Sequence, residues 1–405
     1  MTRSESLLAV IVAFAVGVLG ALSLRPAAEP GRRPALESHV DQKDGAEREA
    51  IHWRVSSAFA KHLPALGGNV AEVADRLRRA SRGAIDWSID DPGEVVPAFA
   101  IVDAVRGGKI DAGYTWLGYD QGRLAVSVLF GAVPFGMTPW EYSAWWTRGG
   151  GRELARSIYR PLGVEPILCG LIGPETAGWF RHEIERPADL EGLKIRFAGI
   201  GGRALQQLGA SVTMMPGGEI FQALEKGAID ATEYSLPEVD ARLGFDRVAR
   251  YNYYPGWHQP FTAFHLVVHA ATWDALADST RATIELACDA GVTRNLASTE
   301  AIQGEVIAEL GARGVETRSL SPALLAALES AAQDVMEELA AEDVDFDRVL
   351  AHQRRFRKRY ARWRTLAYPT SPADSGDLSE SAERARGAGG GTEEIAGDHG
   401  GDRGR

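Results

Sequence analysis

The chain has 405 residues, of which 45% are hydrophobic and 24% are charged, and its formal net charge is −11 at pH 7. This length suffices for two domains with full hydrophobic cores, because single cores stop growing near about 250 to 300 residues. The acidic balance argues against a nucleic-acid partner, since binding to phosphates needs clustered Lys and Arg side chains.

The N-terminal segment has the pattern of an export signal. Arg3 precedes an uninterrupted apolar run over residues 7–24, and Arg25 follows it. Such a run is longer than the core of an ordinary signal peptide and slightly shorter than the roughly twenty residues of a membrane span. Residues 1–25 are therefore predicted to be a cleaved signal peptide or an uncleaved anchor, and residues 26–50 a polar linker. Both alternatives place the folded part outside the cytoplasm.

The first folded part alternates strand and helix patterns. Strand patterns over residues 52–59 and 84–90 flank a helix-period segment from about Gly68 to Ala80. A turn, a helix and another strand follow over residues 91–116. This alternation is typical of parallel sheets with crossover helices.

A similar pattern recurs further along the chain. Residues 104–115 and 223–234 each contain a helix end, a glycine and then Ile-Asp-Ala entering a strand. The recurrence favours two lobes of one plan, although chance similarity between two common strand-helix junctions is the alternative. In parallel sheets ligands bind beyond the carboxyl ends of the strands, so both lobes would present strand ends to a shared cleft.

Two further strands, over residues 167–173 and 261–270, are predicted to cross between the lobes and form a hinge. The predicted fold class is α/β, with two lobes. We assign residues 51–168 with about 261–300 to the first lobe, and residues 169–260 with about 301–345 to the second. The rest of the chain shows helical spacing.

The C-terminal region divides into a helix and a tail. Residues 346–369 are predicted to form a long basic helix, which would either pack on its own lobe or contact a partner. Residues 370–405 are rich in Ser, Gly and charged residues and have almost no large apolar side chain. Such a tail is predicted to be disordered, because it cannot bury enough surface to offset its ordering entropy.

Cys169 and Cys288 are the two cysteines of the sequence. They cannot form a disulfide framework and lack the spacing of a zinc site, so no redox or zinc role follows. One bridge between them and two buried thiols both remain open.

Polar residues at strand ends of the second lobe are the candidates for binding chemistry. Arg196 ends one short strand, and Glu233 and Tyr234 follow another. A guanidinium offers two parallel donors that match a carboxylate. A carboxylate that faces a cleft needs a cation, either Arg196 or a metal ion. The alternatives are a surface salt bridge for Arg196 and a structural ion pair for Glu233.

The same region resembles a known family. The motifs are the Gly-Leu-Lys-Ile-Arg run ending at Arg196, the Pro-Gly-Gly-Glu-Ile run from Pro216, the Gly-Ala-Ile-Asp-Ala-Thr-Glu run ending at Glu233, and the Tyr-Tyr-Pro-Gly-Trp-His-Gln run ending at Gln259. Over about His52 to Ala367 the chain is similar to the solute-binding subunits of tripartite ATP-independent periplasmic (TRAP) transporters. Within that family it resembles the branch that binds 2-oxo and 2-hydroxy monocarboxylates together with a metal ion.

The resemblance implies a periplasmic-binding-protein-like fold, a periplasmic location, a membrane permease as partner and no catalysis. It also implies that the C-terminal helix serves as a contact element in a homodimer. By the same resemblance Arg196 clamps the ligand carboxylate, and the metal ligands are Glu233, the backbone carbonyl of Tyr234, Gln259 and Glu175. This all-oxygen set suits calcium, with sodium as the alternative. A hinge hydrogen bond for Gln259 and a solvated loop acid for Glu175 are the competing interpretations.

Two observations bear on the ligand. Trp116 and Tyr119, at the end of the first lobe's repeat, are predicted to cover the ligand unless they are core residues. Leu171 and Ile172 stand where the resembled branch has an asparagine, which predicts either an apolar wall and a ligand with a hydrophobic side chain or a shifted register of the resemblance at this point.

Signatures of enzymes are missing from the sequence, which has no G-x-S-x-G, H-E-x-x-H, P-loop or dinucleotide fingerprint. We therefore expect an exported receptor that captures a small organic carboxylate with a metal ion. The rival hypotheses are a metal-dependent hydrolase that uses Glu175 and Glu233, and a ligand sensor anchored by residues 7–24.

Overall fold

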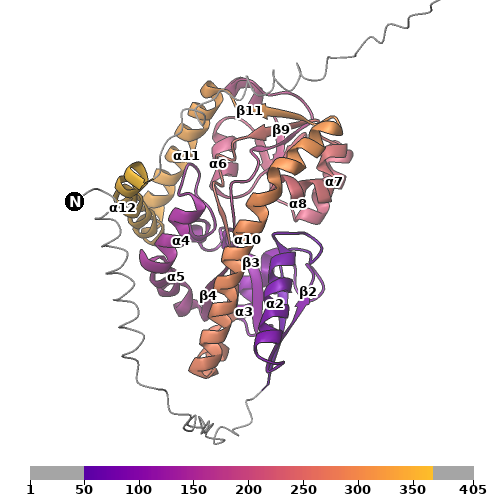
Figure 1. Ribbon diagram of the computed structural model, residues 1–405. Coiled ribbons are helices and arrows are strands. Elements are labelled where there is room, and N and C mark those ends of the chain that lie inside the picture. Colours follow the sequence, from indigo (N-terminus) through magenta and orange to yellow (C-terminus); the bar gives the residue numbers. More distant parts are fainter. Residues whose placement is uncertain (1–49, 368–405) are drawn as a thin grey trace, which may run out of the picture. The chain divides into compact units, whose positions relative to one another are not determined.

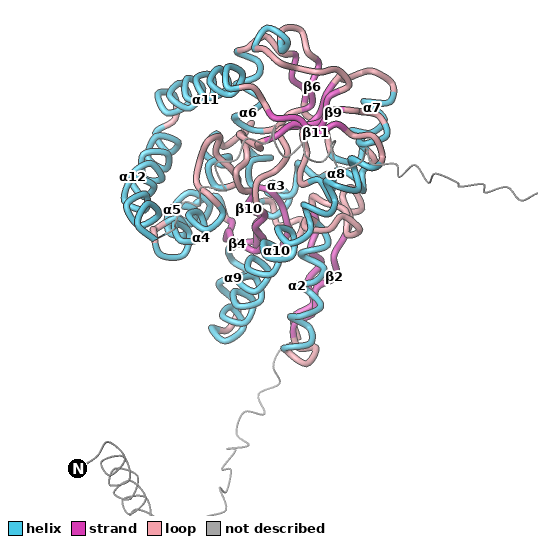
Figure 2. The backbone as a smooth tube through the Cα atoms, turned by 45° about the horizontal axis from the view of Figure 1, so that its top comes forward, coloured by secondary structure: helices cyan, strands magenta, loops and turns pink. Residues whose placement is uncertain are grey.

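The computed structural model describes residues 50–367. The predicted export segment, nearly all of the predicted linker and the predicted tail lie outside the described residues. The described part contains two mixed sheets with helices packed around them (Figures 1 and 2), as the predicted α/β fold class requires.

The first sheet has five strands in the order β2-β1-β3-β10-β4. Strand β1 is parallel to β2 and β3, whereas β10 is antiparallel to both β3 and β4. Strands β4 and β10 are buried along almost their whole length, which explains why both are continuous apolar runs in the sequence. The strands are β1 (Ile51–Ser57), β2 (Ile85–Asp90), β3 (Ala112–Trp116), β4 (Val164–Ile172) and β10 (Thr262–His269).

Helices accompany the first sheet, and the sequence marks where α4 begins. Helix α4 starts with Pro139, and the side chains of Thr138 and Glu141 form a reciprocal capping box that satisfies two backbone donors. The helices are α2 (Gly67–Ala80), α3 (Ile101–Arg106), α4 (Pro139–Arg148), α5 (Gly151–Tyr159) and α9 (Ala270–Ala275).

The second sheet has six short strands in the order β11-β9-β5-β8-β6-β7. Strand β6 lies between β7 and β8 and is parallel to both. The strands are β5 (Gly178–Phe180), β6 (Lys194–Arg196), β7 (Ser211–Thr213), β8 (Ala231–Thr232), β9 (Tyr251–Tyr254) and β11 (Glu316–Ser319). The helices of this part are α6 (Gly199–Gln207), α7 (Gly217–Glu225), α8 (Pro237–Leu243) and α11 (Pro322–Glu342).

The two strands predicted to cross between the lobes are β4 and β10, which both lie in the first sheet, and the chain passes between the sheets in the connections next to them. Residues 173–177 lead from β4 to β5, and residues 255–261 lead from β9 to β10. Helix α10 (Asp278–Ala312) contacts β4 and α2 of the first part and α8 and β11 of the second (Figure 1). With 35 residues it is about 50 Å long, enough to accompany both sheets.

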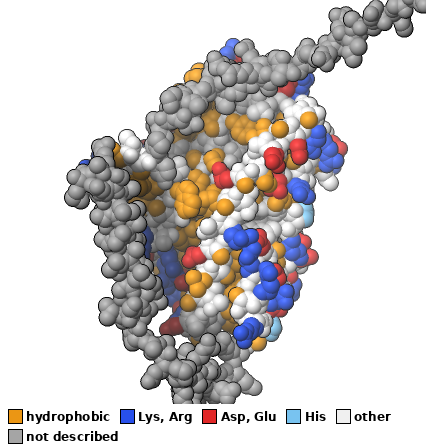
Figure 3. Space-filling view, in the orientation of Figure 1, with side chains coloured by type: hydrophobic (Ala, Val, Ile, Leu, Met, Phe, Trp, Pro, Cys, Tyr) orange, Lys and Arg blue, Asp and Glu red, His pale blue; other side chains and the backbone are white. Residues whose placement is uncertain are grey.

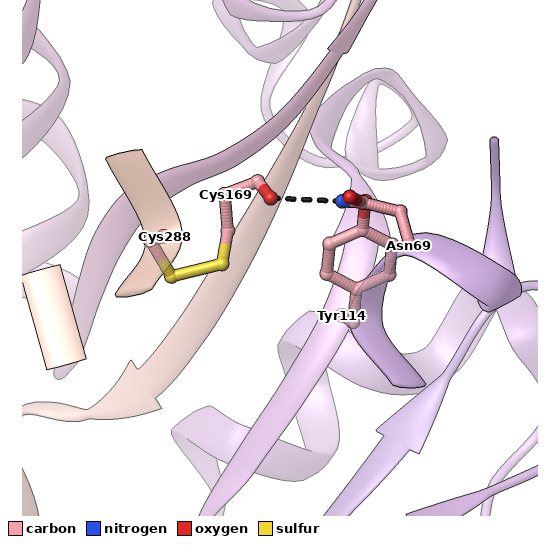
Figure 4. Close-up of a disulfide and its surroundings, with 4 residues drawn as sticks. All are labelled: Asn69, Tyr114, Cys169 and Cys288. Carbon is pink, nitrogen blue, oxygen red and sulfur yellow. Dashed lines mark hydrogen bonds between the residues drawn. A yellow bond between two sulfur atoms is a disulfide. The ribbon is translucent and has the colours of Figure 1, made fainter. Parts of the chain in front are cut away.

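A disulfide joins α10 to the first sheet (Figure 4). Cys288 of α10 is bonded to Cys169 of β4, which selects the bridge over the alternative of two free thiols. The carbonyl oxygen of Cys169 accepts a hydrogen bond of 2.9 Å from the side-chain amide of Asn69, which also donates to the hydroxyl of Tyr114. Such a bridge persists in an oxidising compartment.

The long C-terminal helix predicted from the sequence is α12 (Val344–Ala367). Its Gln353 side chain donates to the carbonyl of Leu129 at 2.7 Å, and Arg364 lies 3.0 Å from the carboxylate of Glu141. The helix therefore packs on the first part of its own chain, while Trp363 and Leu366 are exposed near its end.

A space-filling view shows one face of the described part. The face drawn in Figure 3 carries basic and acidic side chains interspersed with hydrophobic ones. None of the helices within residues 50–367 is long and apolar enough to cross a bilayer.

Candidate functional site

The geometry of the second sheet brings the strand-end candidates together. Arg196 of β6 is in register with Thr232 of β8, and Glu233 is the next residue. Because both strands are parallel, their carboxyl ends lie at the same edge of the sheet. The sequence motifs that end at Arg196 and Glu233 therefore meet in space, as predicted.

Arg196 and Glu233 form a buried ion pair. Only 2% of the Arg196 surface and 1% of the Glu233 surface are exposed, and Nη1 of Arg196 lies 3.0 Å from Oε2 of Glu233. The same nitrogen donates to the backbone carbonyl of Glu233, and Nε donates to the carbonyl of Met215 at 3.4 Å. The guanidinium also faces the ring of Tyr234, with 5.2 Å from its central carbon to the ring centroid. The arginine is thus fixed in one orientation.

Glu175 and Gln259 come from the two connections between the sheets. The backbone amide of Glu175 donates to the carbonyl of Gln259, and both side chains contact the hydroxyl of Thr262. The Gln259 amide donates to that hydroxyl at 2.7 Å, and the hydroxyl donates to Oε1 of Glu175 at 2.8 Å. Gly256 permits this approach, because a Cβ atom there would lie 2.0 Å from the carbonyl oxygen of Glu175.

The structure adds His258, which the sequence analysis did not select. Its ring is buried, with Nε2 3.3 Å from Oε1 of Glu233 and 3.8 Å from Oε2 of Glu175. Ligand atoms of the three residues all lie within 4.8 Å of one another. The available signal was its place in the Trp-His-Gln motif, directly before Gln259. An imidazole therefore lies beside the two carboxylates of the predicted all-oxygen set.

The two carboxylates have different protonation tendencies. Burial and the neighbouring charge of Glu233 raise the pKa of Glu175 to about 8, although His258 opposes this rise. Burial also acts to raise the pKa of Glu233, but His258 and Arg196 outweigh it and hold the pKa at about 2. Glu233 is thus the permanent anion of the pair.

These residues line a narrow cavity between the two sheets. Its volume is about 20 Å³, and its wall on the side of the first sheet is aromatic and aliphatic. Trp116 and Tyr119 both line the cavity, and their rings meet edge to face with centroids 5.2 Å apart. All seven predicted site residues contribute to its lining, together with Phe59, Leu66, Ala198, Thr262 and Phe264.

Leu171 and Ile172 do not form the apolar wall that the sequence analysis expected. Both are fully buried in β4, and neither lines the cavity. The apolar side of the cavity consists instead of Phe59, Leu66 and Phe264. The argument from Leu171 for a hydrophobic ligand is therefore wrong.

Comparison with known proteins places this site in a family. Residues 57–343 match the model of the bacterial extracellular solute-binding proteins, family 7. The chain belongs to this family.

A curated relative gives the same placement. The chain is 32% identical over 313 residues to a monocarboxylate 2-oxoacid-binding periplasmic protein from Nostoc, an alignment that spans 77% of this chain and 86% of the relative.

Solved structures confirm the fold. A TRAP transporter solute-binding protein from Bordetella bronchiseptica superposes with a TM-score of 0.77 at 30% identity, covering 84% of this chain and 99% of the other. That protein is a mixed occupancy dimer with calcium and picolinate in one active site. A second structure, from Pseudoalteromonas atlantica, holds sodium and pyruvate and gives a TM-score of 0.75 at 29% identity over 78% of this chain and 97% of the other.

The family settles the class of function. This solute-binding protein is part of a transport system with membrane permease subunits, and it is not an enzyme. The hydrolase hypothesis for Glu175 and Glu233 is therefore set aside. The predicted periplasmic location is confirmed by its periplasmic relatives, while the anchor predicted over residues 7–24 lies outside the described residues.

Proposed function

We propose that this protein captures a small 2-oxo or 2-hydroxy monocarboxylate, such as pyruvate, together with calcium, and delivers it to a TRAP permease. The observation that carries the proposal is the buried pair of Arg196 and Glu233, 3.0 Å apart on the wall of a cavity between two sheets. A guanidinium there binds a carboxylate through two parallel hydrogen bonds, and its charge persists in a dry site.

The donors around the cavity fit a cation. Oε2 of Glu175 is buried without a hydrogen-bond partner among the described residues, and it lies close to a second carboxylate and an imidazole. We propose Glu233, Glu175, Gln259 and the backbone carbonyl of Tyr234 as its ligands. Oxygen-rich sites suit calcium, which the Bordetella relative holds, and sodium is the alternative because the Pseudoalteromonas relative holds it. The cation would supply a second positive charge for the ligand's oxygens.

Binding must involve motion of the two lobes. A cavity of about 20 Å³ has room for little more than a water molecule, so an organic acid enters only when the cavity widens. The two connections that carry Glu175 and Gln259 also join the sheets, and they are the natural hinge. In this proposal Trp116 and Tyr119 cover the ligand when the lobes close, and the water-poor interior strengthens the contacts with Arg196.

The proposal is tested by calorimetric titration of chelator-treated protein with pyruvate, lactate and 2-oxobutyrate, with and without added calcium or sodium. We expect saturable binding of at least one acid that needs one of the two cations. Failure of every acid to bind under all three conditions would contradict the proposal. Malonate and butyrate serve as controls, because the first carries an extra charge and the second lacks the 2-oxo or 2-hydroxy group.

A further inference from the structure

A second and larger cavity lies beside the site. It has a volume of about 530 Å³ and lies between the segment from Ala58 to Ala98 of the first lobe and the segment from Pro216 to Leu243 of the second. Most of its lining is aliphatic, including Ala60, Leu63 and Pro97. Nothing in the proposed capture of a three-carbon acid uses this space.

Tyr234 is the side chain that the two cavities share. Its ring is 8% exposed and lies between the guanidinium of Arg196, at 5.2 Å, and the backbone of Gly217. A Cβ atom at Gly217 would come within 2.4 Å of the Tyr234 hydroxyl oxygen. Glycine at this position is therefore required for the ring to lie where it does, and Tyr234 belongs to the lining of both cavities.

We propose that the Tyr234 ring sets the upper length of the ligand by closing the binding cavity against the larger one. This inference rests on the proposed function and adds a specificity-determining side chain to it. The backbone carbonyl of Tyr234 is assigned to the cation, whereas its ring acts on the far end of the ligand. Acids with four carbons beyond the carbonyl, such as 2-oxohexanoate, would need the space that the ring occupies.

The chemistry of the larger cavity decides which ligands an open passage would admit. Its lining consists largely of Ala, Leu and Pro residues, with His62, Asp91 and Glu219 among them, so it suits an unbranched alkyl chain and offers no Lys or Arg side chain for a second carboxylate. Each methylene group of a ligand that moves from water into an apolar cavity raises the affinity of the protein for that ligand about fourfold. Monocarboxylic 2-oxo acids with longer chains are therefore the class excluded by the ring.

The test is calorimetric titration with pyruvate and 2-oxohexanoate, in the presence of calcium and sodium, of the wild type, Tyr234→Ala and Tyr234→Phe. We expect the ratio of affinity for 2-oxohexanoate over pyruvate to rise at least about tenfold in Tyr234→Ala. Tyr234→Phe keeps the ring and should keep the wild-type ratio. If the alanine variant does not fold, Tyr234→Leu is measured instead, with a rise in the same ratio expected.

A variant that fills the larger cavity tests whether the alkyl chain of 2-oxohexanoate lies there. Gly218 lines the larger cavity, and a Cβ atom there meets nothing within 4 Å, so Gly218→Leu fills space without displacing a neighbour. Combined with Tyr234→Ala it should abolish the gain for 2-oxohexanoate, while alone it should leave pyruvate binding unchanged. An unchanged ratio in Tyr234→Ala, or a gain that survives Gly218→Leu, would overturn the inference. Absence of binding of both acids by the wild type would instead overturn the proposed function, and this inference with it.

Discussion

Arg196 and Glu233 form a buried ion pair with Nη1 and Oε2 3.0 Å apart. Each side chain neutralises the charge of the other. In addition, Nε2 of His258 lies 3.3 Å from Oε1 of Glu233. Removing one partner of a buried pair leaves an uncompensated charge, which costs about 3 to 5 kcal/mol. Variants at these positions must therefore change the chemistry while keeping the charge or the shape.

Arg196→Lys tests the proposed carboxylate clamp with the charge retained. Lysine is a point charge and cannot make two parallel hydrogen bonds, so affinity for pyruvate should fall by about 100-fold or more, or roughly 3 kcal/mol. Calorimetric titration measures the change. Arg203→Lys, at an exposed position of α6, is the matched control and should bind as the wild type does. Equal pyruvate affinities of Arg196→Lys and Arg203→Lys would show that Arg196 does not bind the carboxylate of the ligand.

Glu233→Gln tests the proposed cation ligand. The substitution keeps the shape and one acceptor oxygen but removes the permanent negative charge. Calcium affinity should fall at least about tenfold, and pyruvate binding should lose its dependence on calcium. Glu238→Gln, which removes a carboxylate on α8 outside the cavity lining, is the control. Calcium dependence that survives in Glu233→Gln would show that the ion is held elsewhere.

At the residue scale, the sequence was most informative where function follows from strand ends. Arg196 and Glu233 were predictable because Arg196 ends one short strand with a crossover pattern and Glu233 directly follows another. His258 was not, because a lone histidine between a tryptophan and a glutamine carries no spacing signal. The role expected for Leu171 was wrong because that side chain is fully buried in β4 and does not line the cavity, which no local pattern reveals.

Among the elements, the disulfide gives the clearest prediction. It closes a loop with a sequence separation of 119 residues between β4 and α10. Cys288→Ser should lower the free energy of unfolding by about 2 to 5 kcal/mol, because the unfolded chain gains conformational freedom. Urea unfolding measures it. Reducing agent should destabilise the wild type by a similar amount and leave the variant unchanged, whereas equal stability of both proteins without reductant would contradict the account.

Strand β10 carries a buried histidine that makes the fold sensitive to acid. His265 packs edge to face on Trp146, with ring centroids 5.0 Å apart, and neither ring nitrogen has a hydrogen-bond partner among the described residues. Burial lowers its pKa from 6.5 to about 3. In the unfolded chain the ring takes up a proton below about pH 6.5, while the folded protein resists it. The stability that the neutral His265 ring contributes is therefore complete above pH 6.5 and is lost as the pH falls towards 3.

His265→Phe should remove this contribution. Between pH 7 and pH 5 the wild type should lose about 2 kcal/mol more than the variant, according to the shift of the His265 pKa. Urea unfolding at a series of pH values measures both slopes. His269→Phe, at the partly exposed end of the same strand, should keep the slope of the wild type. Parallel slopes for the wild type and His265→Phe would show that the ring is not kept neutral by burial.

The helices and strands differ in how well they could be predicted from the sequence. Helices α10 and α11 were predicted because apolar residues recur at helical spacing over many turns. Strands β5 and β11 were missed, since three or four residues are too short for any alternation to show. They gain stability from pairing with β9 on either side, a tertiary contact that local sequence does not encode.

For the molecule as a whole, two sheets, two connections and one long helix support a capture mechanism. The recurring strand-helix pattern led to the predicted pair of lobes, and the assignment of residue ranges to them stays a prediction. The dimer role of α12 also stays a prediction for this chain, although its exposed Trp363 and Leu366 leave apolar surface near the end of that helix.

The most direct test of the central claim is a crystal structure of the protein grown with calcium and pyruvate. The account predicts pyruvate between the two sheets, with its carboxylate on the guanidinium of Arg196 and a calcium ion that contacts both the ligand and Glu233. A structure in which pyruvate lies away from Arg196, or in which calcium has no contact with Glu233, would contradict it.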